Sequence, residues 1–197
     1  LEQSSDDVAG QLPFKLHDFG ARGVSSGESA ALGGMAHLVN FMGSDTLEGI
    51  MAARHYYGAD MAGFSIPAAE HSTMTSWGRE REEDAYANML DAFDGEGQIV
   101  AVVSDSYDLD KAVADIWGGS LRDKVLGRAG TLVVRPDSGD PIETPLRTVR
   151  TLWEKFGGTT NSKGFRVLDP HIRVIQGDGM NIDSIARLGD RMLEEGF

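Results

Sequence analysis

The chain contains no cysteine, so disulfide bridges, thiolate metal sites and cysteine nucleophiles are all excluded. It also has no run of about 18 apolar residues, the length that a membrane-spanning helix needs. Basic residues are scarce, because 18 lysines and arginines stand against 31 aspartates and glutamates, a formal net charge of −13 at pH 7. Broad binding to nucleic acid or to an anionic membrane requires a basic face, so we expect neither as a partner.

The residues that are present favour a single folded domain. The 197 residues are 41% hydrophobic and 25% charged, a composition that is typical of a globular protein and too apolar for a disordered one. The first residues, LEQSSDDVAG, are polar and acidic, unlike a signal peptide, so we expect a cytoplasmic protein. They lack an initiator methionine, and we interpret the chain as part of a longer protein. We predict a polar segment over residues 1–13 and a catalytic domain over residues 14–197.

Short apolar runs alternate with amphipathic helical patterns along the whole chain. The predicted strands are Phe14–Asp18, His37–Phe41, Gly63–Pro67, Ile99–Ser104, Thr131–Arg135 and Ile172–Gln176. The predicted helices are Ser26–Met35, Thr46–Tyr57, Gly78–Phe93, Leu109–Trp117 with Ser120–Leu126, Ile142–Phe156 and Ile182–Glu195. We expect Asp45 and Asp108 to cap helices, and Gly58, Gly118 and Gly157 to end them.

This alternation predicts an α/β fold. The strands are almost wholly apolar, as in parallel sheets that are buried on both faces. About six βα units suit either a barrel or a doubly wound open sheet. Because a closed barrel has eight such units, we expect the barrel to be incomplete in this chain.

Polar and glycine-rich segments follow every predicted strand. The segments are 17–22, 40–45, 70–71, 104–108, 135–139 and 176–179. In a parallel barrel, the carboxyl ends of all strands open on one rim, where catalytic groups gather. A single such segment is equally well explained by a helix cap or a turn. Six together, with arginine and histidine each present twice, favour one catalytic site.

The residue types in these segments suit the chemistry of phosphates. Asp108 and Asp137 are candidate Mg²⁺ ligands, because magnesium binds one or two carboxylates together with phosphate oxygens. The alternative interpretation is that Asp108 caps a helix and Asp137 belongs to a turn. Arg22 and Arg135 have the planar guanidinium fork that binds phosphate, although Arg135 also suits a structural pair with Asp137. The glycine patterns of P-loop and dinucleotide-binding proteins are absent.

Five motifs in a fixed order carry a more specific signal. They are KLHDFG with RGVSS (15–26), PAAEHST (67–73), VSDSYD (103–108), RPDSG (135–139) and VIQGDG (174–179). Together they resemble the nicotinamide phosphoribosyltransferase family, over nearly the whole chain. The resemblance implies a type II phosphoribosyltransferase fold, an irregular TIM-like α/β barrel that is accompanied by a β-rich domain.

The resemblance also implies an activity. Members of the family are pentosyltransferases that join nicotinamide to phosphoribosyl pyrophosphate and form nicotinamide mononucleotide and pyrophosphate in NAD biosynthesis. They use Mg²⁺, hydrolyse ATP through a phosphorylated histidine, and work as homodimers with active sites at the subunit interface. Parts of the family pattern fall outside this chain, including a glycine-rich loop that holds the 5′-phosphate. We therefore expect these 197 residues to carry only part of the active site.

The family roles can be carried over to matching positions. The implied catalytic residues are His71, Asp108 and Asp137, with His71 as the phosphorylated histidine and the two aspartates close to the metal. The implied substrate contacts are Phe19, Arg22, Asp45, Arg135, Gly177 and Asp178. Phe19 would stack on the nicotinamide ring, and Asp45 would accept a hydrogen bond from the carboxamide. An ionised Asp45 would repel the carboxylate of nicotinate, which makes it a discriminator between the two bases.

Three alternatives stay open. The nearest is nicotinate phosphoribosyltransferase, which performs the same chemistry on the acid. A second is a barrel hydrolase whose metal would be bound by His17, His71 and Asp137. A third is an inactive fragment that acts only through interactions, because unpaired sheet edges invite association.

Overall fold

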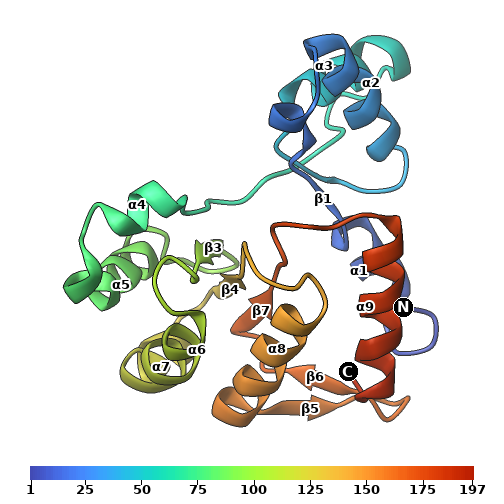
Figure 1. Cartoon of the computed structure of the whole chain (residues 1–197). Helices are drawn as coiled ribbons and strands as arrows, with labels where there is room; N and C mark the ends of the chain where they lie inside the picture. Colours follow the sequence, from blue (N-terminus) through green and yellow to red (C-terminus); the bar gives the residue numbers. More distant parts are fainter. The chain divides into compact units, whose positions relative to one another are not determined.

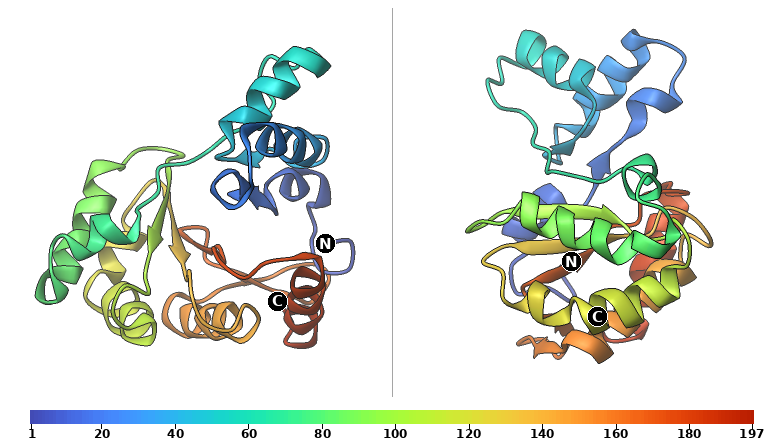
Figure 2. Two further views of the ribbon diagram at one scale, coloured as in Figure 1. Left: turned by 45° about the horizontal axis from the view of Figure 1, so that its top comes forward. Right: turned by 90° about the vertical axis from the view of Figure 1, so that its left-hand side faces the viewer.

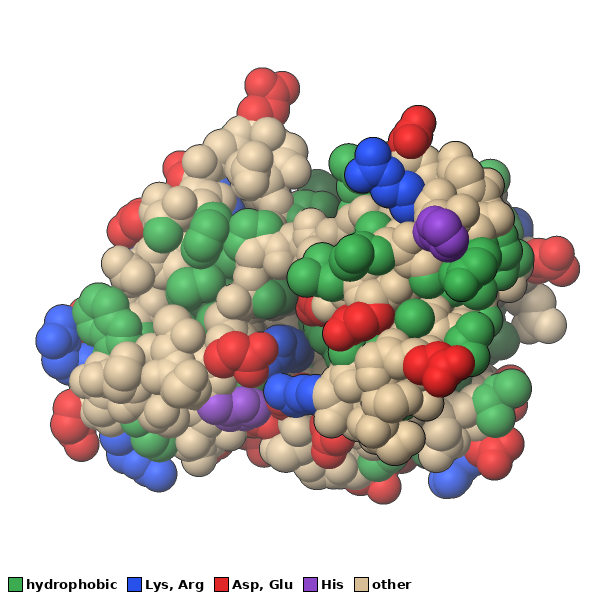
Figure 3. Space-filling model, turned by 90° about the horizontal axis from the view of Figure 1, so that it is seen from above, with side chains coloured by type: hydrophobic (Ala, Val, Ile, Leu, Met, Phe, Trp, Pro, Cys, Tyr) green, Lys and Arg blue, Asp and Glu red, His purple; other side chains and the backbone are tan.

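The computed structural model describes residues 1–197, which form two compact units, Leu1–Ser65 and Ile66–Phe197 (Figure 1). None of its helices is both long enough and apolar enough to cross a bilayer. On the face shown in Figure 3, basic side chains lie among acidic ones and form no broad basic surface.

The sheet of Ile66–Phe197 is parallel and follows the order of the chain. Its strands are β3 (Ile99–Val103), β4 (Thr131–Arg135) and β7 (Ile172–Val174), in the order β3-β4-β7. Val103 lies opposite Arg135, so the two strands end at the same level. An isolated parallel bridge between Ala68 and Ala101 brings the segment before His71 to the other edge of β3. The predicted buried parallel strands are therefore confirmed here, although β3 and β7 end earlier than predicted.

Helices cover this sheet and supply most of its core (Figures 1 and 2). The helical elements of this unit are α4 (His71–Thr75), the 3₁₀ turn η3 (Arg79–Arg81), α5 (Glu82–Ala92), α6 (Leu109–Lys111), the π-helix η4 (Ala112–Ser120), α7 (Arg122–Leu126), α8 (Glu143–Phe156) and α9 (Ile182–Glu194). The last of them, α9, supplies no residue to the core. The largest fully buried side chains include Trp117, Tyr86 and Met74. Burying a large apolar side chain contributes roughly 1.5–3 kcal/mol, so this core dominates the stability of the unit.

Two of the predicted helix signals in this unit are confirmed and one is wrong. The Asp108 carboxylate accepts from Lys111 N at 3.0 Å and caps α6, and Gly157 ends α8 with φ of 73°. Gly118 does not end a helix, because the π-helix continues through it to Ser120. A Cβ on Gly118 would lie 2.5 Å from Cγ of Lys155, so glycine permits close packing at this position.

An antiparallel hairpin that the sequence pattern does not predict is formed by β5 (Gly158–Thr160) and β6 (Arg166–Leu168). Its strands are three residues long, and β5 is wholly exposed. Short exposed strands of this kind show no apolar alternation to detect.

Leu1–Ser65 is built from short elements and two longer helices. These are α1 (Val8–Gln11), η1 (Leu12–Phe14), β1 (His17–Asp18), η2 (Gly20–Gly23), α2 (Gly27–His37), β2 (Gly43–Ser44) and α3 (Leu47–Tyr57). β1 and β2 pair in parallel, and a bridge joins Gly43 to Phe64. Helices α2 and α3 lie side by side in Figures 1 and 2. At their contact, a Cβ on Gly49 would be 2.6 Å from Gly34 Cα. Only paired glycines permit this approach.

Two predictions in this unit are wrong. The predicted strand His37–Phe41 is the end of α2 and a turn, in which Leu38 N donates to Gly34 O and Phe41 N donates to His37 O. These bonds use the backbone donors that a strand would offer, and the strand forms later, at Gly43. Asp45 does not cap α3, because the N-cap is Thr46 and the Asp45 carboxylate accepts from Ser65. Gly58, with φ of 67°, does end α3 as predicted.

The predicted α/β class with parallel strands is thus confirmed. The strands form separate small sheets and no closed barrel, so a TIM-like barrel is not confirmed.

Candidate functional site

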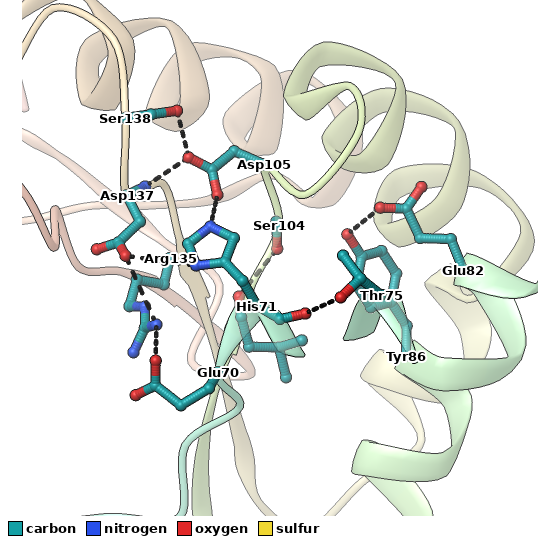
Figure 4. Close-up of polar contacts among 11 residues, drawn as sticks. Glu70, His71, Thr75, Glu82, Tyr86, Ser104, Asp105, Arg135, Asp137 and Ser138 are labelled. Carbon is teal, nitrogen blue, oxygen red and sulfur yellow. Dashed lines mark hydrogen bonds and ion pairs between the residues drawn. The ribbon is translucent and has the colours of Figure 1, made fainter. Parts of the chain in front are cut away.

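The imidazole of His71 lies between two carboxylates in Ile66–Phe197 (Figure 4). Its Nε2 atom is 3.0 Å from Asp105 Oδ1, and its Nδ1 atom is 3.8 Å from Asp137 Oδ2. His71 opens α4, whereas the aspartates follow β3 and β4, so the parallel pairing of the strands brings them together. The His71 side chain is 43% exposed, and that of Asp105 is 5% exposed. The histidine is therefore open to a ligand, and the carboxylate that holds it is nearly covered by the protein.

Asp105 is the most fully bonded carboxylate of the group. Besides its contact with His71, its Oδ2 atom accepts from Asp137 N at 2.9 Å and from the Ser138 hydroxyl. Burial alone would raise the pKa of Asp105, but the hydrogen bonds from Ser138, Asp137 and His71 outweigh it and hold the pKa below its ordinary value. Asp105 is therefore ionised at neutral pH. When His71 is neutral, an Nε2–H that donates to this anion leaves the Nδ1 lone pair available.

Arg135 gives the site a buried cation. It is the last residue of β4, and its side chain is 6% exposed. Its Nη2 atom is 3.7 Å from Glu70 Oε2 and 3.8 Å from Asp137 Oδ2, so the predicted pair with Asp137 is confirmed at ion-pair distance. Both distances exceed that of a hydrogen bond, and Arg135 Nε has no hydrogen-bond partner.

The ends of the two neighbouring strands also carry buried polar atoms that lack a hydrogen-bond partner. Ser106 Oγ, after β3, and Gln176 Oε1, after β7, are also buried without a partner in the protein. Buried polar atoms are rarely left without partners, so these ends suit a bound polar ligand or water. The three atoms come from three adjacent parallel strands, which ties the candidate site to the strand exits.

The glycine-rich turn after β7 reaches the same group. A Cβ on Gly177 would lie 1.9 Å from Asp137 Oδ1, so only glycine fits against this carboxylate. Gly177 N donates to Pro136 O at 2.9 Å, which fixes the approach. Asp178 is exposed, and its carbonyl accepts from Gln176 Nε2 at 2.9 Å. The structure thus places Gly177 in the site and leaves the Asp178 carboxylate at the surface.

Asp108 lies apart from the His71 contacts. It is exposed and caps α6, as the alternative interpretation held. No three His, Asp or Glu side chains are grouped so as to hold a metal ion by themselves. The assignment of Mg²⁺ to Asp108 and Asp137 stays a prediction, in which phosphate oxygens would complete the coordination.

A second group of predicted residues meets within Leu1–Ser65. The rings of His17 and Phe19 lie 4.5 Å apart between centroids, at an interplanar angle of 31°. His17 Nε2 is 3.4 Å from Asp45 Oδ1, and this nitrogen is buried without a hydrogen-bond partner. The Ser65 hydroxyl donates to the same carboxylate oxygen. Arg22 is exposed on the 3₁₀ turn η2.

Most members of the two groups are thus predictable from the sequence, and three contributions to them are not. In Ile66–Phe197, Asp137 lies next to His71, Arg135 and Gly177. In Leu1–Ser65, Phe19 and Asp45 both lie beside His17. The missed residues are Asp105, Ser65 and the role of His17 beside Asp45. Asp105 had a usable signal, since it is the first carboxylate after a buried strand.

Residues 14–197 match the model of the nicotinate phosphoribosyltransferase (NAPRTase) family. A nicotinamide phosphoribosyltransferase of Xanthomonas campestris pv. campestris (strain 8004) is 57% identical over 197 residues, which are 100% of this chain and 42% of that protein. A protein of the same name from Mycoplasma pneumoniae (strain ATCC 29342 / M129 / Subtype 1) is 34% identical over 214 residues, covering 100% of this chain and 44% of that protein. Another, from Acinetobacter baylyi (strain ATCC 33305 / BD413 / ADP1), is 32% identical over 201 residues, with 92% of this chain and 39% of that protein covered. The chain spans less than half the length of these curated relatives.

Proposed function

Because the chain belongs to the nicotinate phosphoribosyltransferase family, we propose that its whole protein transfers a phosphoribosyl group to nicotinamide. The donor is phosphoribosyl pyrophosphate, and the products are nicotinamide mononucleotide and pyrophosphate, in NAD biosynthesis. The names of the curated relatives support nicotinamide as the base. Nicotinate is the second candidate, favoured by the name of the family model.

The observation that carries the proposal is the unsatisfied Arg135 beside His71. A chain with a net charge of −13 needs a local cation to hold a diphosphate. Arg135 is buried, is fixed at a strand end, and has a guanidinium Nε without a partner. Phosphate oxygens would satisfy this donor and gain charge-assisted hydrogen bonds. The structural Arg128 differs, because its Nη atoms donate to the carbonyls of Leu90 and Phe93, whereas Arg135 Nη2 has only the carboxylates of Glu70 and Asp137 at ion-pair distance.

His71 suits the proposed coupling to ATP. Its Nδ1 lone pair would attack the γ-phosphorus, forming an N–P bond while the bond to the ADP oxygen breaks and its electron pair leaves with ADP. The imidazole then carries a positive charge, which the ionised Asp105 stabilises through its contact with Nε2. Water would later hydrolyse the N–P bond and restore His71. This phosphorylation drives synthesis only if it changes the affinity for substrates or products.

Asp137 is the carboxylate best suited to Mg²⁺ in this chain. Three donors occupy Asp105, and Asp108 caps a helix, whereas Asp137 has oxygens near Arg135 and His71. A hard carboxylate oxygen beside a phosphate subsite fits the usual ligands of magnesium. When bound, Mg²⁺ would supply positive charge to the diphosphate leaving group.

The group in Leu1–Ser65 suits recognition of the base. Phe19 offers a ring face for nicotinamide, and Asp45 offers an acceptor for its amide N–H. One Asp45 oxygen is engaged by Ser65, which leaves the other for the ligand. A homodimer is part of the proposal, and the exposed Leu47, Met51 and Tyr56 of this unit support further protein contacts there.

The test is a synthesis assay of the whole protein with nicotinamide and with nicotinate, each with and without ATP. We expect turnover of nicotinamide, stimulated by ATP. A preference for nicotinate would overturn the assignment of the base, and the absence of product from either base would overturn the proposed reaction.

A further inference from the structure

The π-helix forms a buried hydrogen bond with Ser104, the residue before Asp105. Trp117 Nε1 donates to Ser104 Oγ at 3.0 Å, and neither residue has exposed area. The main chain holds Ser104 as well, because its Oγ donates to Val102 O at 2.9 Å and its N donates to Arg135 O at 3.0 Å. Figure 4 shows Ser104 beside the group formed by His71 and Asp105. The backbone that carries the Asp105 carboxylate is therefore fixed from its buried side.

Trp117 is itself fixed by an aromatic stack. Its ring lies 4.4 Å from that of Tyr86, at an interplanar angle of 19°, and Tyr86 OH donates to Glu82 Oε1 at 2.8 Å. Burial raises the pKa of both Tyr86 and Glu82, as expected for ionisable groups in a closed core. Trp117 belongs to the π-helix, whose widened turn includes the bond from Leu121 N to Ile116 O at 2.8 Å. Such π-helical turns are uncommon and often occur near functional sites.

We propose that Trp117, acting through Ser104, is a positioning residue that holds the Asp105 carboxylate against His71. This inference rests on the proposed role of His71 in phosphoryl transfer. The bond between Asp105 and His71 is charge-assisted, and its strength depends on distance and angle. Asp105 must also align with the Asp137 amide and the Ser138 hydroxyl, so a small rotation after Ser104 would disturb three contacts together.

The function of this arrangement is to select one form of the histidine. With Asp105 aligned, the proton of neutral His71 stays on Nε2, and Nδ1 keeps its lone pair for the phosphorus. Without the bond from Trp117, the Ser104 side chain keeps only its bond to Val102 O. We expect this loss to loosen the alignment of Asp105 and to let the proton occupy either nitrogen more often. The reactive tautomer becomes less populated while the core around it stays folded.

The first test is spectroscopic and does not require activity. Trp117→Phe keeps an aromatic ring but removes the N–H donor, and Ser104→Ala removes the acceptor. Val100→Ala is the control, because Val100 is equally buried on the same strand but makes no bond in this arrangement. Nitrogen-15 NMR of the histidine rings in each whole protein, assigned with His71→Ala, reports which His71 nitrogen is protonated. We expect shifted His71 signals in Trp117→Phe and Ser104→Ala and unchanged signals in Val100→Ala.

The second test measures the rate of phosphohistidine formation from ATP. We expect Trp117→Phe to slow it about tenfold, as the loss of one aligned hydrogen bond implies. In an Asp105→Ala background, Trp117→Phe should cause no additional slowing, because Trp117 acts through Asp105. A tenfold effect that persists without Asp105 would overturn the proposal.

Two further outcomes separate this inference from the proposed function. Unchanged His71 signals in both variants, or equal shifts in Val100→Ala, would overturn the positioning role whatever the activity. Failure of the unmodified protein to form phosphohistidine would overturn the proposed role of His71, and the NMR comparison would still decide whether Trp117 positions Asp105.

Discussion

The two compact units of this chain differ in how they hold their candidate site residues. The hydrophobic side chains buried in Leu1–Ser65 are three alanines, Ala30, Ala52 and Ala53, and most of the exposed large hydrophobic side chains belong to this unit. In Ile66–Phe197 a continuous core of aromatic and aliphatic side chains joins the sheet to its helices.

The two groups of candidate site residues therefore rest on different structural supports. His71 and Asp105 lie at the ends of well-packed elements, where a displacement would disturb the core. Phe19 and Asp45 lie beside strands of two residues, in a unit whose helices touch through glycines. We infer that the second group depends on contacts from the rest of the protein for its rigidity, because little apolar area is buried locally.

The largest expected effect is the loss of ATP stimulation in His71→Ala. Without an imidazole, no phosphohistidine forms, and only slow basal synthesis remains. Synthesis rates with and without ATP measure this. Ser72→Ala, an exposed change on the same helix, should retain full stimulation. Persistent stimulation in His71→Ala would remove this residue from the coupling and end the division of roles between the units.

The contrast in packing predicts that replacing a leucine by alanine lowers the free energy of unfolding by different amounts in the two units. Leu132→Ala removes a fully buried side chain of β4 and should cost about 2–5 kcal/mol. Leu47→Ala removes a side chain that is 68% exposed and should cost less than about 0.5 kcal/mol in the 197-residue chain. Urea denaturation followed by circular dichroism measures both. A larger cost of Leu47→Ala in the whole protein would show that this face is covered there, whereas a large cost in the short chain would contradict the comparison.

Asp45→Ala should change the choice of base and leave ATP coupling intact. Loss of a charged acceptor for the carboxamide predicts a fall of about 10- to 100-fold in kcat/KM for nicotinamide. The KM for phosphoribosyl pyrophosphate should change little. Asp60→Ala, which removes another exposed carboxylate of the same unit, is the matched control. Equal losses for both substrates would argue against a specific role in base recognition.

The smallest effect concerns the buried Glu82. Burial raises its pKa above the ordinary value of 4.5 despite the hydrogen bond from Tyr86, so the folded state holds its proton more tightly than the unfolded chain does. The contribution of protonated Glu82 to the free energy of unfolding is therefore complete below about pH 4.5, and it is lost as the pH rises through the pKa of Glu82 in the folded state. Glu82→Gln should flatten this dependence and slightly stabilise the protein at pH 7. Urea midpoints across pH 4–8, compared with the exposed Glu83→Gln, test the sign, and destabilisation at pH 7 by Glu82→Gln alone would refute it.

Helices and strands are predictable from the sequence where neighbouring residues alone determine them. The predicted bounds of the strand Thr131–Arg135 match the structure, because four apolar or β-branched residues followed by a charged one form a complete local pattern. The run His37–Phe41 had a similar composition, yet α2 continues into it, because hydrogen bonds to Gly34 and His37 compete with strand formation. The predicted break after Trp117 is wrong, because Gly118 and Gly119 interrupt the apolar pattern but the backbone of the π-helix continues through them.

The order of the motifs and the alternation of apolar runs determined the α/β class and the family without coordinates, because both are properties of neighbouring residues. The carboxylate that partners His71, Asp105 rather than Asp108, could by contrast not be identified from neighbouring residues. Both aspartates follow β3 and lie three residues apart, and only the tertiary structure, in which the segment before His71 bridges β3 at Ala101, decides which carboxylate faces the histidine. The other is left to cap a helix, because a side chain directed at the amides of its own next turn cannot also reach across the sheet.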